Sequence, residues 1–141
     1  MEFFQEVHSA KIDVKSLQKL LTINNLTILC ASISTLTAQK ENEADIYCIW
    51  GSFYVKREEI RYGVRFSLLN CPHALAWTIT YDEQSQNIII HCTIDKTETD
   101  SDFVDSIHEF VLDWSKGIAK ALDQTHSNSF KSDGAHIAPP G

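Results

Sequence analysis

The sequence has little glycine, proline and cysteine, and it lacks long uncharged hydrophobic runs. Its 141 residues include five glycines, three prolines and four cysteines. No hydrophobic run approaches the about 20 residues that a membrane-spanning helix requires. The first residues, Met1 to Glu6, carry neither the basic nor the apolar segment of a secretory signal. We therefore expect a cytoplasmic protein that does not enter a membrane.

The cysteines are too scattered to form a recognisable redox or metal motif. Cys30, Cys48, Cys71 and Cys92 are far apart, and no CxxC pair exists. In a reducing compartment such residues behave as small apolar core residues. We expect neither disulfides nor a bound metal or cofactor.

Positive charge and catalytic motifs are also scarce. The chain has 12 Lys and Arg against 19 Asp and Glu, a formal net charge of −7. This balance argues against nonspecific binding to nucleic acids or anionic membranes. The sequence contains no GxSxG, P-loop, GxGxxG, HExxH or EF-hand pattern. We therefore expect a protein that is not an enzyme.

The composition is that of one globular domain. Hydrophobic residues make up 43% of the chain, enough for a sizeable core. We expect a single domain over residues 1–124. The polar residues 125–141 predict a disordered tail, and an added expression sequence is an open alternative for part of it.

The first part of the chain predicts one helix and two strands. Apolar residues in 2–23 recur at helical spacing, although Asp13 is an alternative cap for a shorter helix that begins at Val14. Asn24 and Asn25 would end this helix. Residues 26–37 and 45–56 are rich in strand-forming residues, and a turn follows at Arg57–Glu58.

Three clearer strands follow, and then a long helix. Alternating apolar residues predict strands over 60–68, 75–82 and 88–94, with breaks at 70–73 and 83–86. Residues 101–124 have helical spacing, and residues 99–102 resemble a capping box. Gly117 in this helix suggests close packing on the sheet.

These elements predict an α+β fold. It is a two-layer domain with a five-stranded antiparallel meander sheet. An N-terminal helix and a long C-terminal helix pack on one face of the sheet.

The outward face of the last three strands is a candidate binding surface. By alternation it presents two arginines and several small polar residues, beside the ordinary interpretation of a solvated sheet face. The arginines would be charged anchors for an acidic or polar partner. The candidate residues are Arg61, Arg65, Thr78, Thr80 and His91, with Thr93 beside them.

The C-terminal helix carries a second candidate surface, which is acidic. Its carboxylates recur at spacings of 4, 3, 4 and 4, typical of one solvated helix face and also of a surface for a basic partner. These residues are Glu98, Asp102, Asp105, Glu109 and Asp113.

Two further groups are weaker candidates. Trp77 and Trp114 fall on the predicted core sides of a strand and of the helix, where they pack as core or line a pocket between helix and sheet. Cys71 beside His73 is the one place to look for an activated thiol, although packing is the favoured interpretation.

Two functions remain open. The leading hypothesis is a non-enzymatic protein-binding module of the chaperone, inhibitor or immunity kind, whose partner is another protein or a second copy of the chain. The layout from Trp77 to the 102–122 helix is similar in outline to secretion chaperones, and such a likeness does not determine function. The alternative is a helix-grip domain that holds a small apolar ligand between the long helix and the sheet, as a binder or an enzyme.

Overall fold

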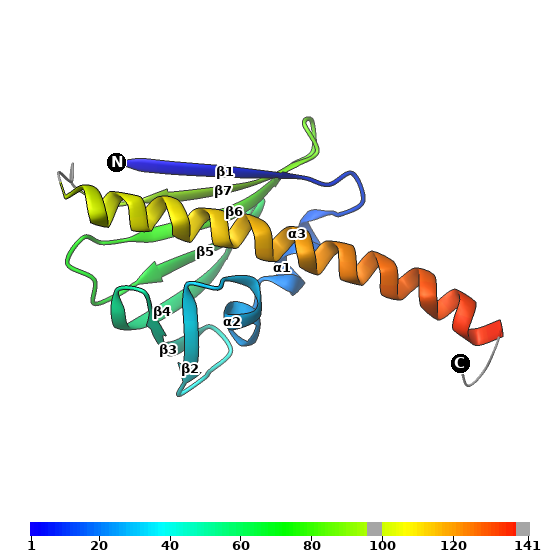
Figure 1. Ribbon diagram of the computed structural model, residues 1–141, viewed down its shortest axis with the longest axis horizontal. Helices are drawn as coiled ribbons and strands as arrows, with labels where there is room; N and C mark the ends of the chain where they lie inside the picture. Colours follow the sequence, from blue (N-terminus) through cyan, green and yellow to red (C-terminus); the bar gives the residue numbers. More distant parts are fainter. Residues whose placement is uncertain (96–99, 138–141) are drawn as a thin grey trace.

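The structure is a computed structural model that describes residues 1–95 and 100–137, with side chains described up to residue 123. Eleven elements follow one another in these residues (Figure 1). They are β1 (Glu2–His8), α1 (Val14–Leu20), the 3₁₀ turn η1 (Ile23–Asn25), α2 (Leu26–Leu29), β2 (Ile33–Thr37), β3 (Glu43–Cys48), β4 (Gly51–Ile60), β5 (Gly63–Leu68), β6 (Ala76–Asp82), β7 (Asn87–Thr93) and α3 (Ser101–Ile137).

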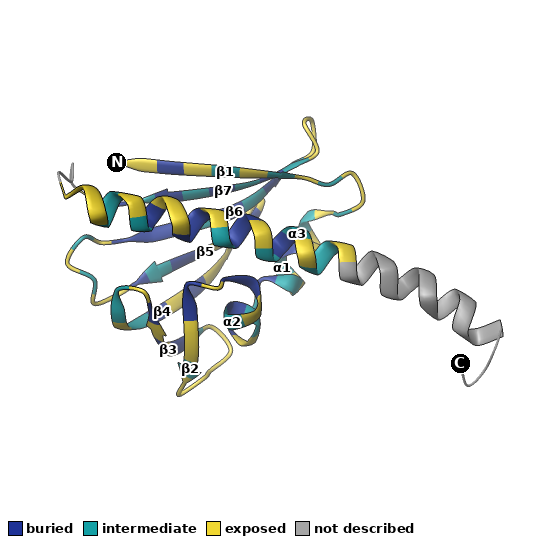
Figure 2. Cartoon of the chain, in the orientation of Figure 1, coloured by how far each residue is buried: buried dark blue, intermediate teal, exposed yellow. Residues whose placement is uncertain are grey.

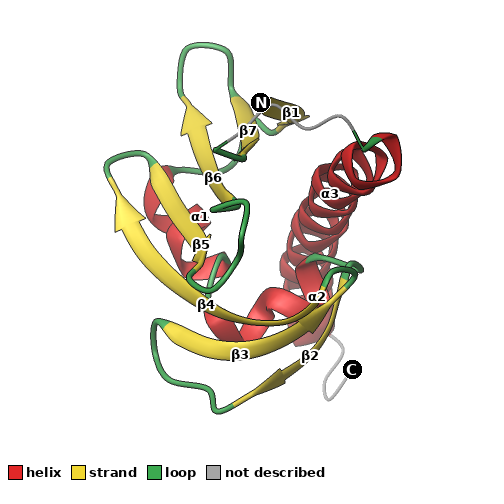
Figure 3. Ribbon diagram, turned by 90° about the vertical axis from the view of Figure 1, so that its left-hand side faces the viewer, coloured by secondary structure: helices red, strands yellow, loops and turns green. Residues whose placement is uncertain are grey.

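The strands form one curled antiparallel sheet, and α3 lies along its concave side (Figures 1 and 3). The strand order is β1-β7-β6-β5-β4-β3-β2, so the chain's first two strands occupy the two edges. The predicted α+β class is confirmed, as is the antiparallel meander of the later strands. The sheet that the described residues form has seven strands and not five.

The N-terminal segment is the largest correction to the predicted fold. Residues 2–8 form β1, which pairs with β7 from Glu2↔Thr93 to His8↔Asn87. Only Phe3 of this strand is fully buried. The other residues of β1 alternate in exposure with period two. Residues four positions apart share a face in a strand and also in a helix, so seven residues do not distinguish the two structures. The sheet edge offered by β7 therefore outweighs the local helical pattern.

The alternative that begins a helix at Val14 is confirmed. Asp13 is the N-cap of α1, and its carboxylate accepts a hydrogen bond of 2.8 Å from the backbone N–H of Ser16. This bond lowers the pKa of Asp13, because it stabilises the charged form. The helix ends at Leu20, before the predicted stop at Asn24 and Asn25.

The next two predicted strands are both subdivided. Residues 26–29 form the short helix α2, and only residues 33–37 form a strand. The strand predicted over 45–56 is a hairpin, in which Cys48 pairs with Gly51 across a turn at Ile49–Trp50. Gly51 has a φ of +111°, which favours glycine, and this explains the position of the turn.

Arg57 does not form the predicted turn but lies within β4, where it is buried. Its guanidinium donates hydrogen bonds to the carbonyl oxygens of Gln18 (2.9 Å) and Leu21 (2.5 Å) at the end of α1. It also bonds Asn42 at 3.0 Å and Glu59 at 3.2 Å. A cation placed on the last carbonyls of a helix satisfies them and opposes the helix dipole. Arg57 thus fastens α1 to the sheet.

The later strands agree with the sequence pattern. β6 and β7 lie where they are predicted, and their inward residues are buried. The strand predicted over 60–68 begins only at Gly63. Tyr62, predicted to face inward, lies in the preceding turn and is 50% exposed.

The helix α3 buries one stripe against the sheet (Figure 2). This stripe contains Ile107, Phe110, Val111, Trp114 and Ile118, all at 1% exposure or less. Each such side chain contributes about 1.5–3 kcal/mol through burial. The backbone N–H groups of Asp102 and Phe103 donate to the Asp100 carboxylate at 3.0 and 3.4 Å, while Thr99 of the predicted capping box lies outside the described residues.

Gly117 allows a close approach, but its neighbour is α2 and not the sheet. A Cβ added at Gly117 would lie 1.8 Å from the carbonyl oxygen of Leu29. Alongside, the Ser32 hydroxyl bonds the Asp113 carboxylate at 2.5 Å. These contacts hold the middle of α3 against the end of α2. The helix continues to Ile137 and not to the predicted end at residue 124, and positions 138–141 lie outside the described residues.

Candidate functional site

An apolar cavity of about 300 Å³ lies between the first turn of α3, the β3–β4 turn and the loop between β5 and β6. The β3–β4 turn and β4 form one wall, the loop between β5 and β6 forms another, and α3 contributes Phe103. The lining residues are Trp50, Phe53, Cys71, Pro72, His73, Leu75 and Phe103.

Trp50 fastens the β3–β4 turn to α3. Its indole N–H donates a hydrogen bond of 2.8 Å to the Ser106 hydroxyl. Its ring lies 4.8 Å from Phe110 and 6.1 Å from Phe103, measured between ring centroids. A tryptophan in a hairpin turn is thereby held as a rigid wall of the cavity.

The loop between β5 and β6 is held on both sides. The N–H of Asp95 donates to the carbonyl oxygen of His73 at 3.0 Å, next to the end of β7. The His73 ring stacks on Phe103 with centroids 4.6 Å apart. Ala74 completes the loop in the left-handed region, with a φ of 49°. The loop thus places Cys71 and His73 at the cavity.

The four cysteines lie in different surroundings. Burial raises the pKa of the Cys30 and Cys92 thiols to about 12, and it also raises the pKa of Cys48. These three are buried, whereas Cys71 is half-buried and lines the cavity. Sequence reasoning selected Cys71 and His73 as a pair, and the structure brings both to the same cavity.

The region under the middle of α3 is filled with aromatic rings. Trp77 lies 5.3 Å from Phe66 and 4.9 Å from Phe110, and Trp114 lies 5.8 Å from Phe66. The rings of Trp77 and Trp114 meet, with centroids 6.0 Å apart. Neither tryptophan is among the lining residues of the cavities described here. Within the described part of the chain, neither indole N–H has a hydrogen-bond partner.

The predicted polar sheet face is present on the convex side of the sheet. Arg65 pairs with Thr78, and Thr78 pairs with His91, so the three lie in one row across β5, β6 and β7. Thr80 lies two residues further along β6 on the same face, as does Thr93 on β7. Arg61 does not join them, because it lies in the β4–β5 turn with its guanidinium 5.1 Å from the Tyr62 ring centroid.

His91 already has two neighbours on this face. Its imidazole lies 2.9 Å from the Glu2 carboxylate and stacks on Phe4, with ring centroids 4.3 Å apart. Both neighbours come from β1, the strand that sequence reasoning missed. His91 and its neighbour Cys92 point to opposite faces of the sheet, since Cys92 is fully buried.

The predicted acidic line is only partly a free surface. Asp102, Asp105 and Glu109 are exposed on α3, whereas Asp113 is half-buried and bonded to Ser32. Glu98 lies outside the described residues. In the described ranges, 1–95 and 100–123, no group of three or more His, Cys, Asp or Glu side chains is placed to hold a metal ion.

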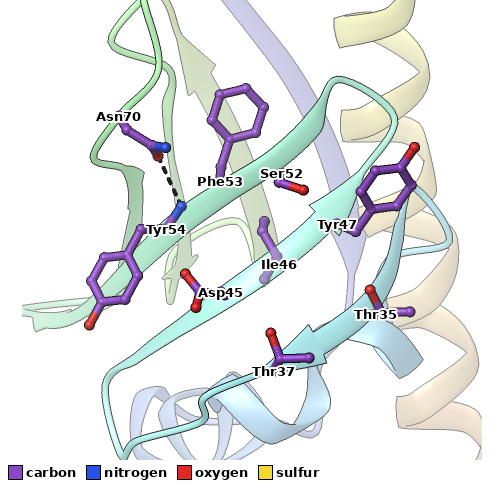
Figure 4. A pocket seen from close by; sticks show the side chains of 9 residues that line it. All are labelled: Thr35, Thr37, Asp45, Ile46, Tyr47, Ser52, Phe53, Tyr54 and Asn70. Carbon is purple, nitrogen blue, oxygen red and sulfur yellow. Dashed lines mark hydrogen bonds between the residues drawn. The ribbon is translucent and has the colours of Figure 1, made fainter.

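A second hollow, of about 400 Å³, lies on the convex side of β2, β3 and β4 (Figure 4). We call it the outer groove. Its lining residues are Thr35, Thr37, Asp45, Ile46, Tyr47, Ser52, Phe53, Tyr54 and Asn70. Sequence reasoning missed it, because the alternation in 45–56 was interpreted as one strand and not as a hairpin. Gly51 was the signal for the turn.

Comparisons with known proteins give a likeness of fold alone. No family model matches the chain, and no curated protein matches it. One solved structure, an uncharacterised protein from Bacillus thuringiensis, is similar with a TM-score of 0.57 at 15% sequence identity. The match covers 86% of this chain and 96% of that protein. In the described residues, no helix is both long enough and apolar enough to cross a membrane.

Proposed function

We propose that this protein binds a compact, neutral, apolar ligand in the cavity at the start of α3. The observation that carries the proposal is the aromatic lining of that cavity by Trp50, Phe53 and Phe103. Ligand sites are typically concave and apolar, with a few polar groups that orient the ligand. Here Cys71 and His73 are those polar groups.

The volume of the cavity limits the size of the ligand. A closed apolar cavity of about 150 Å³ accommodates one benzene molecule. The present cavity, at about 300 Å³, suits two fused rings. A long acyl chain would have to continue under α3, where Phe66, Trp77, Phe110 and Trp114 fill the space. The proposed ligand is therefore a bicyclic aromatic molecule, the size of indole or naphthalene.

The layout of strands and helices supports the helix-grip domain, the alternative among the two sequence-based hypotheses. A helix-grip domain usually has more than five strands and two short helices near its start. The described part of this chain contains seven strands and the short helices α1 and α2. The helix predicted over residues 2–23 is β1 followed by α1, and the protein-binding role stays a prediction.

The proposed role is binding without chemical conversion. The lining contains no carboxylate and no lysine among the described residues, and its titratable groups are Cys71 and His73. A general acid–base pair of carboxylates, or a lysine that forms a Schiff base, would have to come from elsewhere.

The test is titration of the purified protein with indole and, separately, with dodecanoate, followed by NMR. We expect saturable binding of indole with a Kd of about 0.1–1 mM, as its few heavy atoms allow. We expect no saturable binding of dodecanoate. The shifted amides should surround Trp50, Cys71 and Phe103.

A matched pair of variants identifies the cavity. Cys71→Trp places a large ring in the cavity and should abolish indole binding, whereas Cys71→Ser keeps its volume and should bind indole within about threefold of the parent. Indole binding that survives in folded Cys71→Trp protein would contradict the proposal. So would the absence of saturable indole binding in the parent protein.

A further inference from the structure

The outer groove differs in chemistry from the apolar cavity. Its lining has three aromatic residues, Tyr47, Phe53 and Tyr54, together with the carboxylate of Asp45 and several hydroxyl and amide side chains (Figure 4). No lysine or arginine lines it among the described residues. These groups suit a ligand that is rich in hydrogen-bonding groups and is not anionic.

The register of the strands explains how these groups come together. Asp45 pairs with Tyr54 on β4 and with Thr37 on β2, and Tyr47 pairs with Ser52 and with Thr35. Two parallel rows of three side chains thus stand on the convex face. In β2 the register shifts between Ile33 and Thr35, and such an irregularity bends an edge strand.

Backbone contacts hold the groove in shape. The Asn70 side chain accepts a hydrogen bond of 2.9 Å from the backbone N–H of Tyr54. The Ser34 hydroxyl donates to the carbonyl oxygen of Tyr47 at 3.0 Å. Partial burial and the nearby Glu43 carboxylate raise the pKa of Tyr54, because both disfavour the charged phenolate. A site that is already organised loses less freedom on binding.

We propose that the outer groove binds a neutral saccharide. A tyrosine ring offers an apolar face for the C–H side of a sugar ring and a hydroxyl at its edge. The Asp45 carboxylate accepts hydrogen bonds from two sugar hydroxyls, and bonds to a charged acceptor are the stronger kind. The Ser52, Thr35 and Thr37 hydroxyls both donate and accept.

The charge of the groove argues against the other polar ligands. A phosphate or carboxylate would lie beside Asp45 and near Glu43, with no cation in the lining. A wholly apolar molecule would leave the carboxylate and hydroxyls of the groove unpaired. A lysine-rich peptide is the remaining competitor, and the test must separate it from a saccharide.

The experiment titrates ¹⁵N-labelled protein with a panel of neutral trisaccharides built from glucose, mannose, galactose or N-acetylglucosamine, and in parallel with a trilysine peptide. We expect at least one trisaccharide to shift the amides of Asp45, Tyr47 and Tyr54 with a saturable, about millimolar Kd. Tyr47→Ala should weaken this binding about tenfold.

Tyr62→Ala is the matched control. Tyr62 and Tyr47 are similarly exposed, at 50% and 56%, but Tyr62 lies in the β4–β5 turn outside the groove. Its removal should leave saccharide binding unchanged. Cys71→Trp should also bind saccharide normally, because Cys71 lines the apolar cavity and not the outer groove, and the two linings share only Phe53.

Three results would overturn the inference. One is that no trisaccharide of the panel shifts the three amides. Another is that Tyr47→Ala and Tyr62→Ala weaken binding equally. The third is that trilysine saturates the groove while the saccharides do not.

Discussion

The contact between α3 and the sheet is built differently under the middle of the helix and at its start, although both places are lined with aromatic residues. Under the middle of the helix, Phe66, Trp77, Phe110 and Trp114 pack ring against ring and are almost completely buried. At the start of the helix, the Phe103 ring faces a cavity of about 300 Å³. The same helix is therefore an anchor in one place and the wall of a hollow in another.

This difference shows that aromatic content alone does not distinguish a filled core from the lining of a cavity. The middle of α3 is held by Gly117 against the Leu29 carbonyl and by Asp113 against Ser32. At its start, Trp50 reaches α3 from a turn, through the Ser106 hydroxyl. Close backbone approach leaves no space, whereas a side chain that spans the gap keeps the cavity open.

The largest difference in stability between the two places is expected when a core ring under the middle of α3 is removed. Trp114→Ala should lower the free energy of unfolding by about 3–5 kcal/mol, through lost burial and the cavity that remains. That is a large share of the about 5–15 kcal/mol typical of a domain. Phe103→Ala should cost clearly less, because its ring already borders a cavity. Urea denaturation of both variants measures the difference.

A milder substitution tests whether loss of the ring causes the effect of Trp114→Ala. Trp114→Phe keeps most of the ring and removes an indole N–H that has no partner in the described structure. An unpaired buried donor costs about 1–3 kcal/mol, so this variant should lose much less stability than Trp114→Ala. Equal losses of unfolding free energy for Phe103→Ala and Trp114→Ala would contradict the expected difference between the start and the middle of α3.

A smaller effect is expected from adding one carbon atom at Gly117. Gly117→Ala improves helix propensity, but its Cβ meets the Leu29 backbone at 1.8 Å, so α3 and α2 must move apart. We expect a net loss of about 1–3 kcal/mol in urea denaturation. Lys116→Ala, one residue away on the exposed side, should change stability by less than about 0.5 kcal/mol. A stabilised Gly117→Ala protein would show that the contact is not close.

The smallest effect leaves the fold unchanged and compares the thiols. At pH 8 a group with a pKa of about 12 is ionised to about one part in ten thousand, so Cys30 and Cys92 should resist alkylation in the native state. Cys71, at the cavity, should react with iodoacetamide first. Mass spectrometry of the partly labelled protein locates the modified thiol, and indole should slow the labelling. Labelling of Cys92 before Cys71 would contradict the position of Cys71 at an accessible cavity.

The second half of the fold could be predicted from the sequence, and the first half could not. In β6 and β7 one face is buried and the other is polar, so alternation is visible in the side chains. In residues 2–8 only Phe3 is fully buried, and helical and strand periods cannot be separated over so short a segment. Leu26 and Leu29 belong to a one-turn helix, which is too short to show a period.

The candidate site was predictable only in part. The break at Cys71–Pro72–His73 marked a loop, and that loop lines the apolar cavity. The partners of the loop, Trp50 and Phe103, are separated from it by tens of residues, and nothing local relates them. The row of Arg65, Thr78 and His91 followed from alternation, whereas Arg61 was misplaced because the strand begins two residues after it.

The pairing of β1 with β7 has a consequence for how the chain folds. Met1 and Ile94 are joined by backbone hydrogen bonds, so the sheet's outermost ladder closes a loop of more than ninety residues. Contacts of such long sequence separation form late, because the entropy of closing the loop is lost before the contact is gained. During synthesis β1 must therefore wait for its partner β7. The β6–β7 hairpin, closed by only four residues, is the local structure that can form first and offer β1 its edge.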